Sequence, residues 1–237
     1  MEPPALAAEP GTIETMTTTA LFIALEGTDG SGLSTQTERL AGWFRATGRP
    51  VHATKEPSGG PAGLLLRLAL AHRLGYGTQG AAHDSDGDFR PLDEATLALL
   101  FAADRMDHLA GEVLPRLERG VAVVCDRYAL SSYAYQGLGV DVDWLRALNA
   151  RARPPDLTVF IDVPTEVGVE RMRARGLVER YEQRETLVRV RDHFHRLIPA
   201  LQAEGQRIAV VDGTLPPDAV HAAIVDRVAG SQPATGY

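Results

Sequence analysis

The chain has 237 residues, of which 44% are hydrophobic and 23% charged, and its formal net charge is -7. This length and composition fit one large α/β domain or two small ones, with ample material for a core. The negative charge argues against binding to duplex nucleic acid, because no overall basic field would attract phosphate backbones. The single cysteine, Cys125, excludes a disulfide framework and a cysteine metal cluster, and it favours a reducing cytoplasm.

Both ends of the chain are expected to lie outside the folded part. Residues 1–18 contain three prolines, three glutamates and no basic residue. A secretory signal needs a positive start and an apolar run, and a transit peptide is rich in arginine, so a disordered leader is predicted. Residues 230–237, GSQPATGY, are predicted to form a short tail. No apolar run approaches the length of a membrane span, and we expect no membrane association.

Five short apolar runs alternate with longer stretches that have helical spacing. They are LFIAL (21–25), VHAT (51–54), VAVVC (121–125), LTVFID (157–162) and RIAVVD (207–212). Four are rich in Val, Ile and Leu, as in strands buried on both faces of a parallel sheet. Between the first two runs, Leu33, Leu40 and Phe44 share one side of a helix that Gly48 ends. This alternation predicts a doubly wound α/β fold, a five-stranded parallel sheet with helices on both faces.

A glycine-rich segment follows the first apolar run. GTDGSGLST, residues 27–35, matches the phosphate-binding pattern G-x-x-x-x-G-K-[ST], except that Leu33 stands where a lysine is expected. The glycines allow successive N–H groups to point at one anion, and the start of the next helix adds positive potential. We therefore expect Ser34 beside Mg²⁺. The residues expected around the nucleotide phosphates are Gly27, Thr28, Asp29, Gly30, Ser31, Gly32, Leu33, Ser34 and Thr35.

One long segment, residues 74–91, interrupts the alternation. It is rich in glycine and aspartate and has few apolar residues. Compact domains seldom keep so long a loop, so it is predicted to be an inserted lid, a loop that contacts a partner, or a partly disordered segment. His83, Asp84, Asp86 and Asp88 could suggest a metal site, but polar loops commonly collect such residues, and we favour no metal there.

The segment VAVVCDRYALSSYAYQG, residues 121–137, carries more specific information. A buried strand ends in Asp126 with Arg127 next, and this pattern resembles the thymidylate kinase family, whose members move the γ-phosphate of ATP onto dTMP. Other motifs of the family are resembled in the same order: EGTDGSG (26–32), KEPSGGPAGLLLR (55–67), LALLFAADRMDHL (97–109), PPDLTVFIDV (154–163) and RMRARGLVERYEQRE (171–185). The resemblance implies a P-loop NTPase fold with one kinase domain over residues 19–229. It also implies ATP, Mg²⁺ and a homodimer.

The resemblance implies roles for individual side chains. Phe101 would stack on thymine, and Arg105 would reach a base carbonyl. A tyrosine against C2′ would exclude ribose, and the sequence leaves both Tyr133 and Tyr135 open for that role. Asp29 would lie near the acceptor sugar or the metal. The set implied for dTMP is Asp29, Lys55, Glu56, Pro57, Arg67, Phe101, Arg105, Arg127, Ser131, Ser132, Tyr135 and Gln136, with Arg67 and Arg127 near its phosphate. The set implied for the metal is Asp29, Ser34, Asp126 and Glu182.

Residues 171–196 contain eight arginines interleaved with glutamates. Most of these arginines are expected to pair along an exposed helix face. The resemblance implies that about residues 171–186 form a lid whose arginines neutralise charge on the transferred phosphoryl group. The catalytic residues implied are Asp29, Asp126, Arg127, Arg173, Arg175 and Arg180.

The missing loop lysine leaves three functions open. The loss of one charge-assisted hydrogen bond corresponds to roughly a ten- to hundredfold loss in rate. We expect an active dTMP kinase in which a lid arginine supplies the charge. Lys55, the only lysine in the chain, is the second candidate, although we expect it to face the acceptor. The alternatives are a nucleotide-binding module with little activity, and a kinase for another nucleoside monophosphate.

Overall fold

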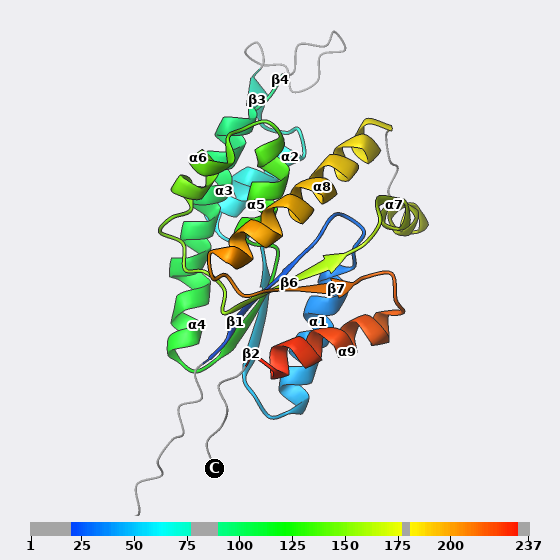
Figure 1. Ribbon diagram of the computed structural model, residues 1–237. Helices are drawn as coiled ribbons and strands as arrows, with labels where there is room; N and C mark the ends of the chain where they lie inside the picture. The colour runs from blue at the N-terminus through cyan, green and yellow to red at the C-terminus, as the bar shows by residue number, and fades with distance from the viewer. Residues whose placement is uncertain (1–19, 77–89, 177–180, 232–237) are drawn as a thin grey trace, which may run out of the picture.

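A single parallel sheet organises the computed structural model, which describes residues 20–76, 90–176 and 181–231, with the backbone alone for 181–183. The strand order is β2-β5-β1-β6-β7 (Figure 1). The strands are β1 (Phe22–Glu26), β2 (Val51–Lys55), β5 (Ala122–Asp126), β6 (Leu157–Asp162) and β7 (Ile208–Asp212). All neighbouring pairs are parallel. The predicted five-stranded sheet is therefore confirmed.

Two of the strands reach one residue further than their apolar runs and end on a carboxylate. β1 includes Glu26 and β5 includes Asp126, and both strands are buried throughout. In the register of the sheet, Asp126 lies between Leu25 of β1 and Lys55 of β2. Because the strands are parallel, these residues share the carboxyl edge of the sheet, where ligands bind in open α/β folds.

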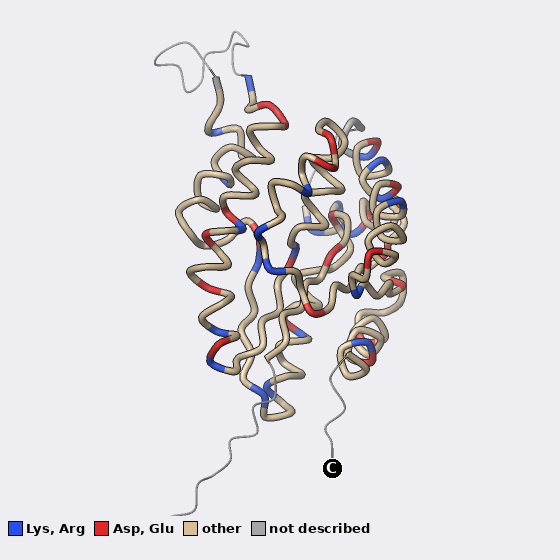
Figure 2. The backbone as a smooth tube through the Cα atoms, turned by 60° about the vertical axis from the view of Figure 1, so that its left-hand side comes forward, with Lys and Arg blue, Asp and Glu red and all other residues tan. Residues whose placement is uncertain are grey.

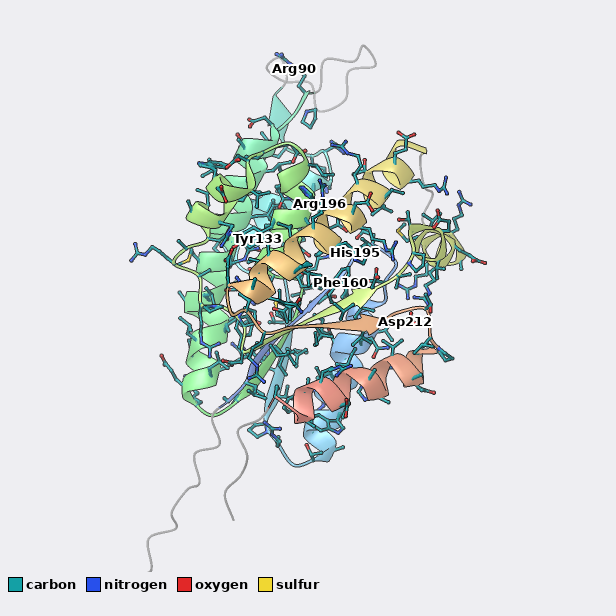
Figure 3. All side chains as sticks on the ribbon, in the orientation of Figure 1. Arg90, Tyr133, Phe160, His195, Arg196 and Asp212 are labelled. Atoms are coloured by element: carbon teal, nitrogen blue, oxygen red, sulfur yellow. The ribbon has the colours of Figure 1, made fainter. Side chains whose placement is uncertain are left out.

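Helices cover both faces of the sheet, as the sequence predicted. One face packs against α1 (Leu33–Ala46) and α9 (Pro217–Ala229). The other face packs against α5 (Ala129–Tyr135), α8 (Tyr181–Ala203) and a rod made of α3 (Glu94–His108), the π-helical turn η1 (Leu109–Val113) and α4 (Leu114–Glu118) (Figure 1). In Figure 3, His195 of α8 lies beside Phe160 of β6, and the two rings meet edge to face at 5.9 Å.

Local sequence explains where the main helices begin and end. In α1 the residues Leu33, Leu40 and Phe44 are buried, and Gly48, with φ 73°, follows the end of the helix. Asp93 caps α3, because its side chain accepts a 3.0 Å hydrogen bond from the N–H of Thr96. The remaining elements are α2 (Pro61–Leu70), the 3₁₀ turn η2 (Gln136–Leu138), α6 (Val142–Leu148) and α7 (Thr165–Ala174).

The two ends of the segment 74–91 pair with each other as short strands. Its two strands, β3 (Gly75–Tyr76) and β4 (Arg90–Pro91), are antiparallel, so the expectation of a loop over the whole segment is wrong at its ends. The candidate metal residues between them, 83–88, lie outside the described residues. Across the described ranges no helix is both long and apolar enough to span a membrane. Acidic and basic residues are interspersed along the helices in the view of Figure 2.

Candidate active site

The loop between β1 and α1 has the geometry of an anion cradle. Gly30 and Gly32 have positive φ angles of 80° and 93°, a conformation that favours glycine. A Cβ on Gly30 would collide with the backbone of Gly168 in α7, so the loop lies tightly against that helix. No side chain caps the start of α1, and the buried hydroxyl of Ser31 has no hydrogen-bond partner in the described residues. Unpaired N–H groups at a helix start and a free hydroxyl fit a phosphate group.

Leu33, at the position of the missing lysine, packs into the protein. Its side chain is only 6% exposed and belongs to the core cluster that contains Leu25 and Ile161. Leucine here therefore contributes to the core and supplies no charge to the loop. Any cation that neutralises a phosphate at this loop has to come from another element.

The loop forms one wall of a cavity of about 220 Å³ that we call the phosphate hollow. Its lining residues are Thr28, Asp29, Gly30, Ser31, Gly32, Leu33, Ser34, Lys55, Glu56, Asp126, Arg127 and Arg175. Three cations, Lys55, Arg127 and Arg175, come to this hollow from near the ends of β2, β5 and α7. Of the predicted loop residues, Gly27 and Thr35 are not part of its wall. The hollow thus combines an anion cradle with positive side chains.

Ser34 and Asp126 bring two side-chain oxygens together in the wall of the phosphate hollow. The Ser34 hydroxyl donates a 2.7 Å hydrogen bond to Oδ2 of Asp126. Mg²⁺ prefers such oxygens and is usually held by one or two carboxylates together with substrate phosphates. In the described part of the chain, no group of three or more His, Cys, Asp or Glu side chains could hold a metal alone. These two residues therefore fit Mg²⁺ that arrives with a nucleotide.

Arg127 connects the loop to α5. Its φ of 69° is unusual for a residue other than glycine, and its guanidinium donates to the Gly27 carbonyl at 2.8 Å and to Asp29 at 2.7 Å. It also donates to Ser131 at 3.2 Å and stands 5.2 Å from the ring centre of Tyr135. Burial would lower the pKa of Arg127, but the nearby Tyr135 and carboxylates outweigh burial and raise it. The side chain therefore remains a fixed positive charge.

Glu26 holds the start of α5 in place through hydrogen bonds. It is fully buried, and its Oε1 accepts hydrogen bonds from the backbone N–H of Tyr128 at 3.0 Å and of Ser131 at 3.2 Å. Its Oε2 is hydrogen-bonded to the Ser131 hydroxyl. Burial raises the pKa of Glu26 to about 7, against the lowering effect of these hydrogen bonds and of Arg127. Sequence reasoning did not single out this residue, although it directly precedes the glycine-rich loop.

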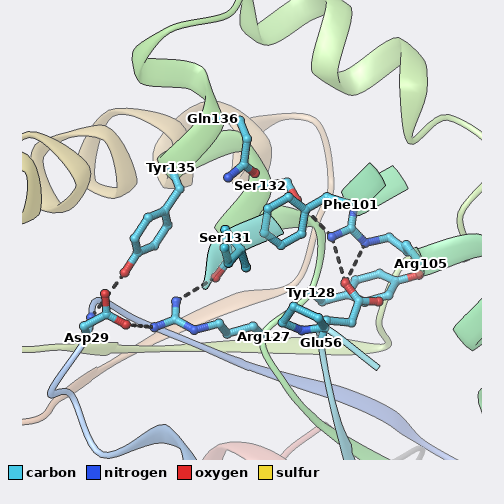
Figure 4. Close-up of a pocket in the computed structure, with 12 residues that line it drawn as sticks. Asp29, Glu56, Phe101, Arg105, Arg127, Tyr128, Ser131, Ser132, Tyr135 and Gln136 are labelled. Atoms are coloured by element: carbon cyan, nitrogen blue, oxygen red, sulfur yellow. Dashed lines mark hydrogen bonds and ion pairs between the residues drawn. The ribbon is translucent and has the colours of Figure 1, made fainter. Parts of the chain in front are cut away.

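A second cavity, which we call the aromatic pocket, adjoins the phosphate hollow and has a volume of about 260 Å³ (Figure 4). Asp29, Glu56 and Arg127 line both cavities. Phe101 is half-buried and lies at the pocket. The full lining is Asp29, Glu56, Pro57, Leu70, Phe101, Arg105, Arg127, Tyr128, Ser131, Ser132, Tyr135 and Gln136. Aromatic walls with a few polar groups fit a flat heterocycle.

Arg105 is locked at the inner end of the aromatic pocket (Figure 4). The side chain is 1% exposed, and its Nε and Nη2 donate to Oε2 of Glu56 at 3.0 and 2.8 Å. Nη2 also donates to Ser132 at 3.0 Å, and Nη1 donates to Asn149. Burial would lower the pKa of Arg105, but Glu56, Tyr128 and Tyr133 together outweigh burial and raise the pKa. These bonds fix the orientation of the guanidinium and leave one of its five N–H groups unused.

The structure brings most of the predicted acceptor residues together, with two exceptions. Lys55 lines the phosphate hollow and does not line the aromatic pocket, and its predicted place near the acceptor remains a proposal. Arg67 lines neither cavity, and its Nη1 donates to the carbonyls of Pro57 (3.1 Å) and Ser58. Of the two tyrosines left open, Tyr135 lines the pocket and Tyr133 does not.

The predicted lid is only partly described. Arg175 lines the phosphate hollow, and Arg173 lies on α7. Arg180 and the side chain of Glu182 lie outside the described residues.

Sequence reasoning missed several residues that shape the site. Tyr128 and Leu70 line the aromatic pocket, and Tyr128 could have been found because it completes the DRY motif. Asn149 and His108 hold Arg105 and Glu56 in place, with His108 Nδ1 3.3 Å from Oε1 of Glu56. No local pattern marks Asn149, which lies 44 residues from Arg105 in the sequence.

Comparison with known proteins agrees with this geometry. The thymidylate kinase family profile matches residues 25–224. The chain is 41% identical over 211 residues to the thymidylate kinase of Thermomicrobium roseum, covering 86% of this chain and 91% of that protein. It is 39% identical over 219 residues to the thymidylate kinase of Leifsonia xyli (89% and 95% covered), and 39% identical over 164 residues to the probable thymidylate kinase of Pyrococcus abyssi (68% and 74% covered). The chain therefore belongs to the thymidylate kinase family.

Proposed function

We propose that the chain transfers the γ-phosphate of ATP to dTMP and so produces dTDP. The observation that carries this proposal is the adjacency of the two cavities, which share Asp29, Glu56 and Arg127. A phosphorylated nucleoside in the aromatic pocket would point its phosphate at a nucleotide held by the loop. The family match supports neither alternative, the silent binding module or the kinase for another nucleoside monophosphate.

The donor phosphates are assigned to the phosphate hollow. The start of α1 and the hydroxyl of Ser31 would bind phosphate oxygens, and Arg175 would approach them from the end of α7. Ser34 and Asp126 would hold Mg²⁺, which would supply positive charge to the phosphates. The other predicted lid residues keep their proposed roles. Arg173 and Arg180 would neutralise charge on the transferred phosphoryl group, and Glu182 would lie near Mg²⁺.

The acceptor base is assigned to the aromatic pocket. Phe101 would stack on the ring, and the unused N–H of Arg105 would donate to a base carbonyl. The amide of Gln136 has a buried oxygen without a hydrogen-bond partner in the described residues, so it would accept an N–H of the base. Tyr135 would pack against C2′ and exclude a ribose hydroxyl.

The reaction needs positioning and charge more than proton transfer. An oxygen of the dTMP phosphate forms the new bond to the γ-phosphorus, while the bond from that phosphorus to the bridging oxygen breaks. The electron pair of the broken bond leaves with ADP. Arg127 lies on the boundary between the two cavities, so its fixed charge would serve the acceptor phosphate and the moving phosphoryl group.

We also propose a homodimer in the cytoplasm. α2 and α3 pack together and expose Leu64, Leu65, Leu99 and Met106, each 40–55% accessible, and a second copy would cover this apolar surface. The unpaired, buried Cys125 supports a reducing compartment.

A panel of acceptors tests the proposed function. The kcat/KM with ATP and Mg²⁺ is measured for dTMP, dUMP, the ribonucleotide of thymine, dCMP and AMP. We expect dTMP to exceed the others, with the ribonucleotide and the purine at least tenfold lower. A preference for AMP or dCMP would contradict the assignment of the acceptor.

A further inference from the structure

The lone lysine of the chain lies in the phosphate hollow, next to the position where the loop lysine is missing. Lys55 is the last residue of β2, and its register partner on β5 is Asp126. Asp126 accepts the hydrogen bond from Ser34, in the first turn of α1. Lys55, Leu33 and Ser34 all line the hollow. The cation and the loop therefore face the same space from different elements.

The end of β2 and the first turns of α1 border the same cavities. β5 separates β2 from β1, so the end of β2 lies about 10 Å from the end of β1 along the sheet. However, Ser34 and Thr37 of α1 line one groove together with Lys55, so the first turns of α1 lie beside the end of β2. A lysine has a flexible four-carbon stem that ends in a compact charge with three donors, so its ammonium can approach phosphates from the β2 side.

Among the residues that the structure describes, the ammonium of Lys55 has no committed partner. Within the described residues it makes no hydrogen bond or ion pair, although Asp126 is its neighbour on β5. Arg127, in contrast, is bound to Asp29, Gly27 and Ser131. Arg175 also reaches the hollow, from the C-terminal end of α7. Lys55 is the cation that a strand of the central sheet holds at the hollow.

We propose that Lys55 replaces the missing loop lysine and binds the β- and γ-phosphates of the donor nucleotide. The inference rests on the proposed function for its effect on turnover, but its effect on nucleotide binding can be measured separately. In this proposal the positive charge has moved from the position of Leu33 to the position of Lys55. The position on α1 supplies core packing, and the position on β2 supplies the charge.

One competing orientation follows from the neighbourhood of Lys55. The residue also lines a groove on the side of α1, together with Glu38 and Glu112. Glu112 already pairs with His52 at 2.5 Å, which leaves Glu38 as the exposed carboxylate in that groove. If the ammonium of Lys55 pointed into this groove and not toward the phosphates, the replacement of Lys55 would leave the affinity for MgATP unchanged.

The test measures the affinity for MgATP by calorimetry, the affinity for dTMP alone, and dTMP-dependent turnover. The variants are Lys55→Ala, Lys55→Arg, Leu33→Lys and the double variant Lys55→Ala/Leu33→Lys. Arg45→Ala, an exposed cation in the last turn of α1, is the matched control. Arg175→Ala tests the competing cation.

We expect Lys55→Ala to lower turnover and weaken MgATP binding by at least tenfold, while the dTMP affinity changes by less than twofold. Lys55→Arg should retain most of the turnover and most of the MgATP affinity. Leu33→Lys should restore the Lys55→Ala chain to within severalfold of the natural one, because the ammonium returns to α1. If Leu33→Lys does not fold, the contrast between Lys55→Ala and Lys55→Arg still decides the proposal.

Three results would overturn it. The first is a Lys55→Ala chain that binds MgATP as tightly as Arg45→Ala does. The second is a Lys55→Ala chain whose KM for dTMP rises while its MgATP affinity is unchanged, which would assign Lys55 to the acceptor. The third is a loss of MgATP affinity confined to Arg175→Ala. If the natural chain binds MgATP but does not phosphorylate dTMP, the proposed function fails, and the MgATP affinities alone decide the role of Lys55.

Discussion

Replacement of Glu26 by glutamine should make the protein more stable at alkaline pH and leave its stability at acid pH almost unchanged. Burial raises the pKa of Glu26 from 4.5 to about 7. Below pH 4.5 both the folded and the unfolded chain hold the proton, and between pH 4.5 and 7 the unfolded chain alone releases it. The contribution of this group to stability is therefore fully present below pH 4.5 and is lost as the pH rises through about 7.

The magnitude follows from the size of the shift. One pKa unit corresponds to about 1.4 kcal/mol, so a shift of roughly 2.5 units gives about 3 kcal/mol in total. About 2.5 kcal/mol of this develops between pH 5 and pH 8. A glutamine does not titrate, and it keeps the hydrogen bonds, because its oxygen accepts from Tyr128 and Ser131 while its amide donates to the Ser131 hydroxyl.

The assay is urea unfolding at pH 5, 6, 7 and 8, followed by tryptophan fluorescence. The free energy of unfolding of Glu26→Gln minus that of the natural chain should grow by about 2.5 kcal/mol across this range. Glu118→Gln, at an exposed position, is the matched control. A flat difference for Glu26→Gln, or a variant that is less stable than the natural chain at pH 8, would refute the reasoning.

Three further predictions concern the aromatic pocket and the dimer. Phe101→Ala should raise the KM for dTMP by roughly 5- to 150-fold, since stacking on a base contributes about 1–3 kcal/mol, whereas Phe101→Tyr should change it little; equal KM values would contradict the stacking role. Arg105→Gln should lower the free energy of unfolding by about 3 kcal/mol or more, because Glu56, 2% exposed, loses its buried partner; a change below about 1 kcal/mol in a urea titration would contradict this. Leu99→Glu should convert the dimer into a monomer in sedimentation velocity, and an unchanged dimer would exclude the α3 surface as the interface.

The fold could be predicted because strands in the core of a parallel sheet form continuous apolar runs, and the chain contains four such runs and a fifth short run, VHAT, at suitable spacing. The end of β5 at Asp126 was indicated by its motif, but the end of β1 could not be predicted, because Glu26 is polar and still belongs to a buried strand. Their carboxylates are satisfied by residues from α5 and α1, far away in the sequence.

Only part of the site could be predicted, because some of its residues come together through the packing of distant elements. Motif order indicated Phe101 and Arg105, but the place of Lys55 depends on how the end of β2 and the start of α1 come together, which no local pattern contains. Tyr133 and Tyr135 are two residues apart on a helix, so they point in opposite directions, and only the packing of α5 decides which one lines the pocket.

The most direct test of the account is ADP release by the natural chain with saturating ATP and Mg²⁺, in the presence and absence of dTMP. The account predicts release that requires dTMP, saturates with it, and reaches the order of 1–100 s⁻¹ found for kinases, although Leu33 occupies the lysine position. Tight binding of dTMP without any dTMP-dependent release of ADP would contradict the account and identify a nucleotide-binding protein on a kinase fold.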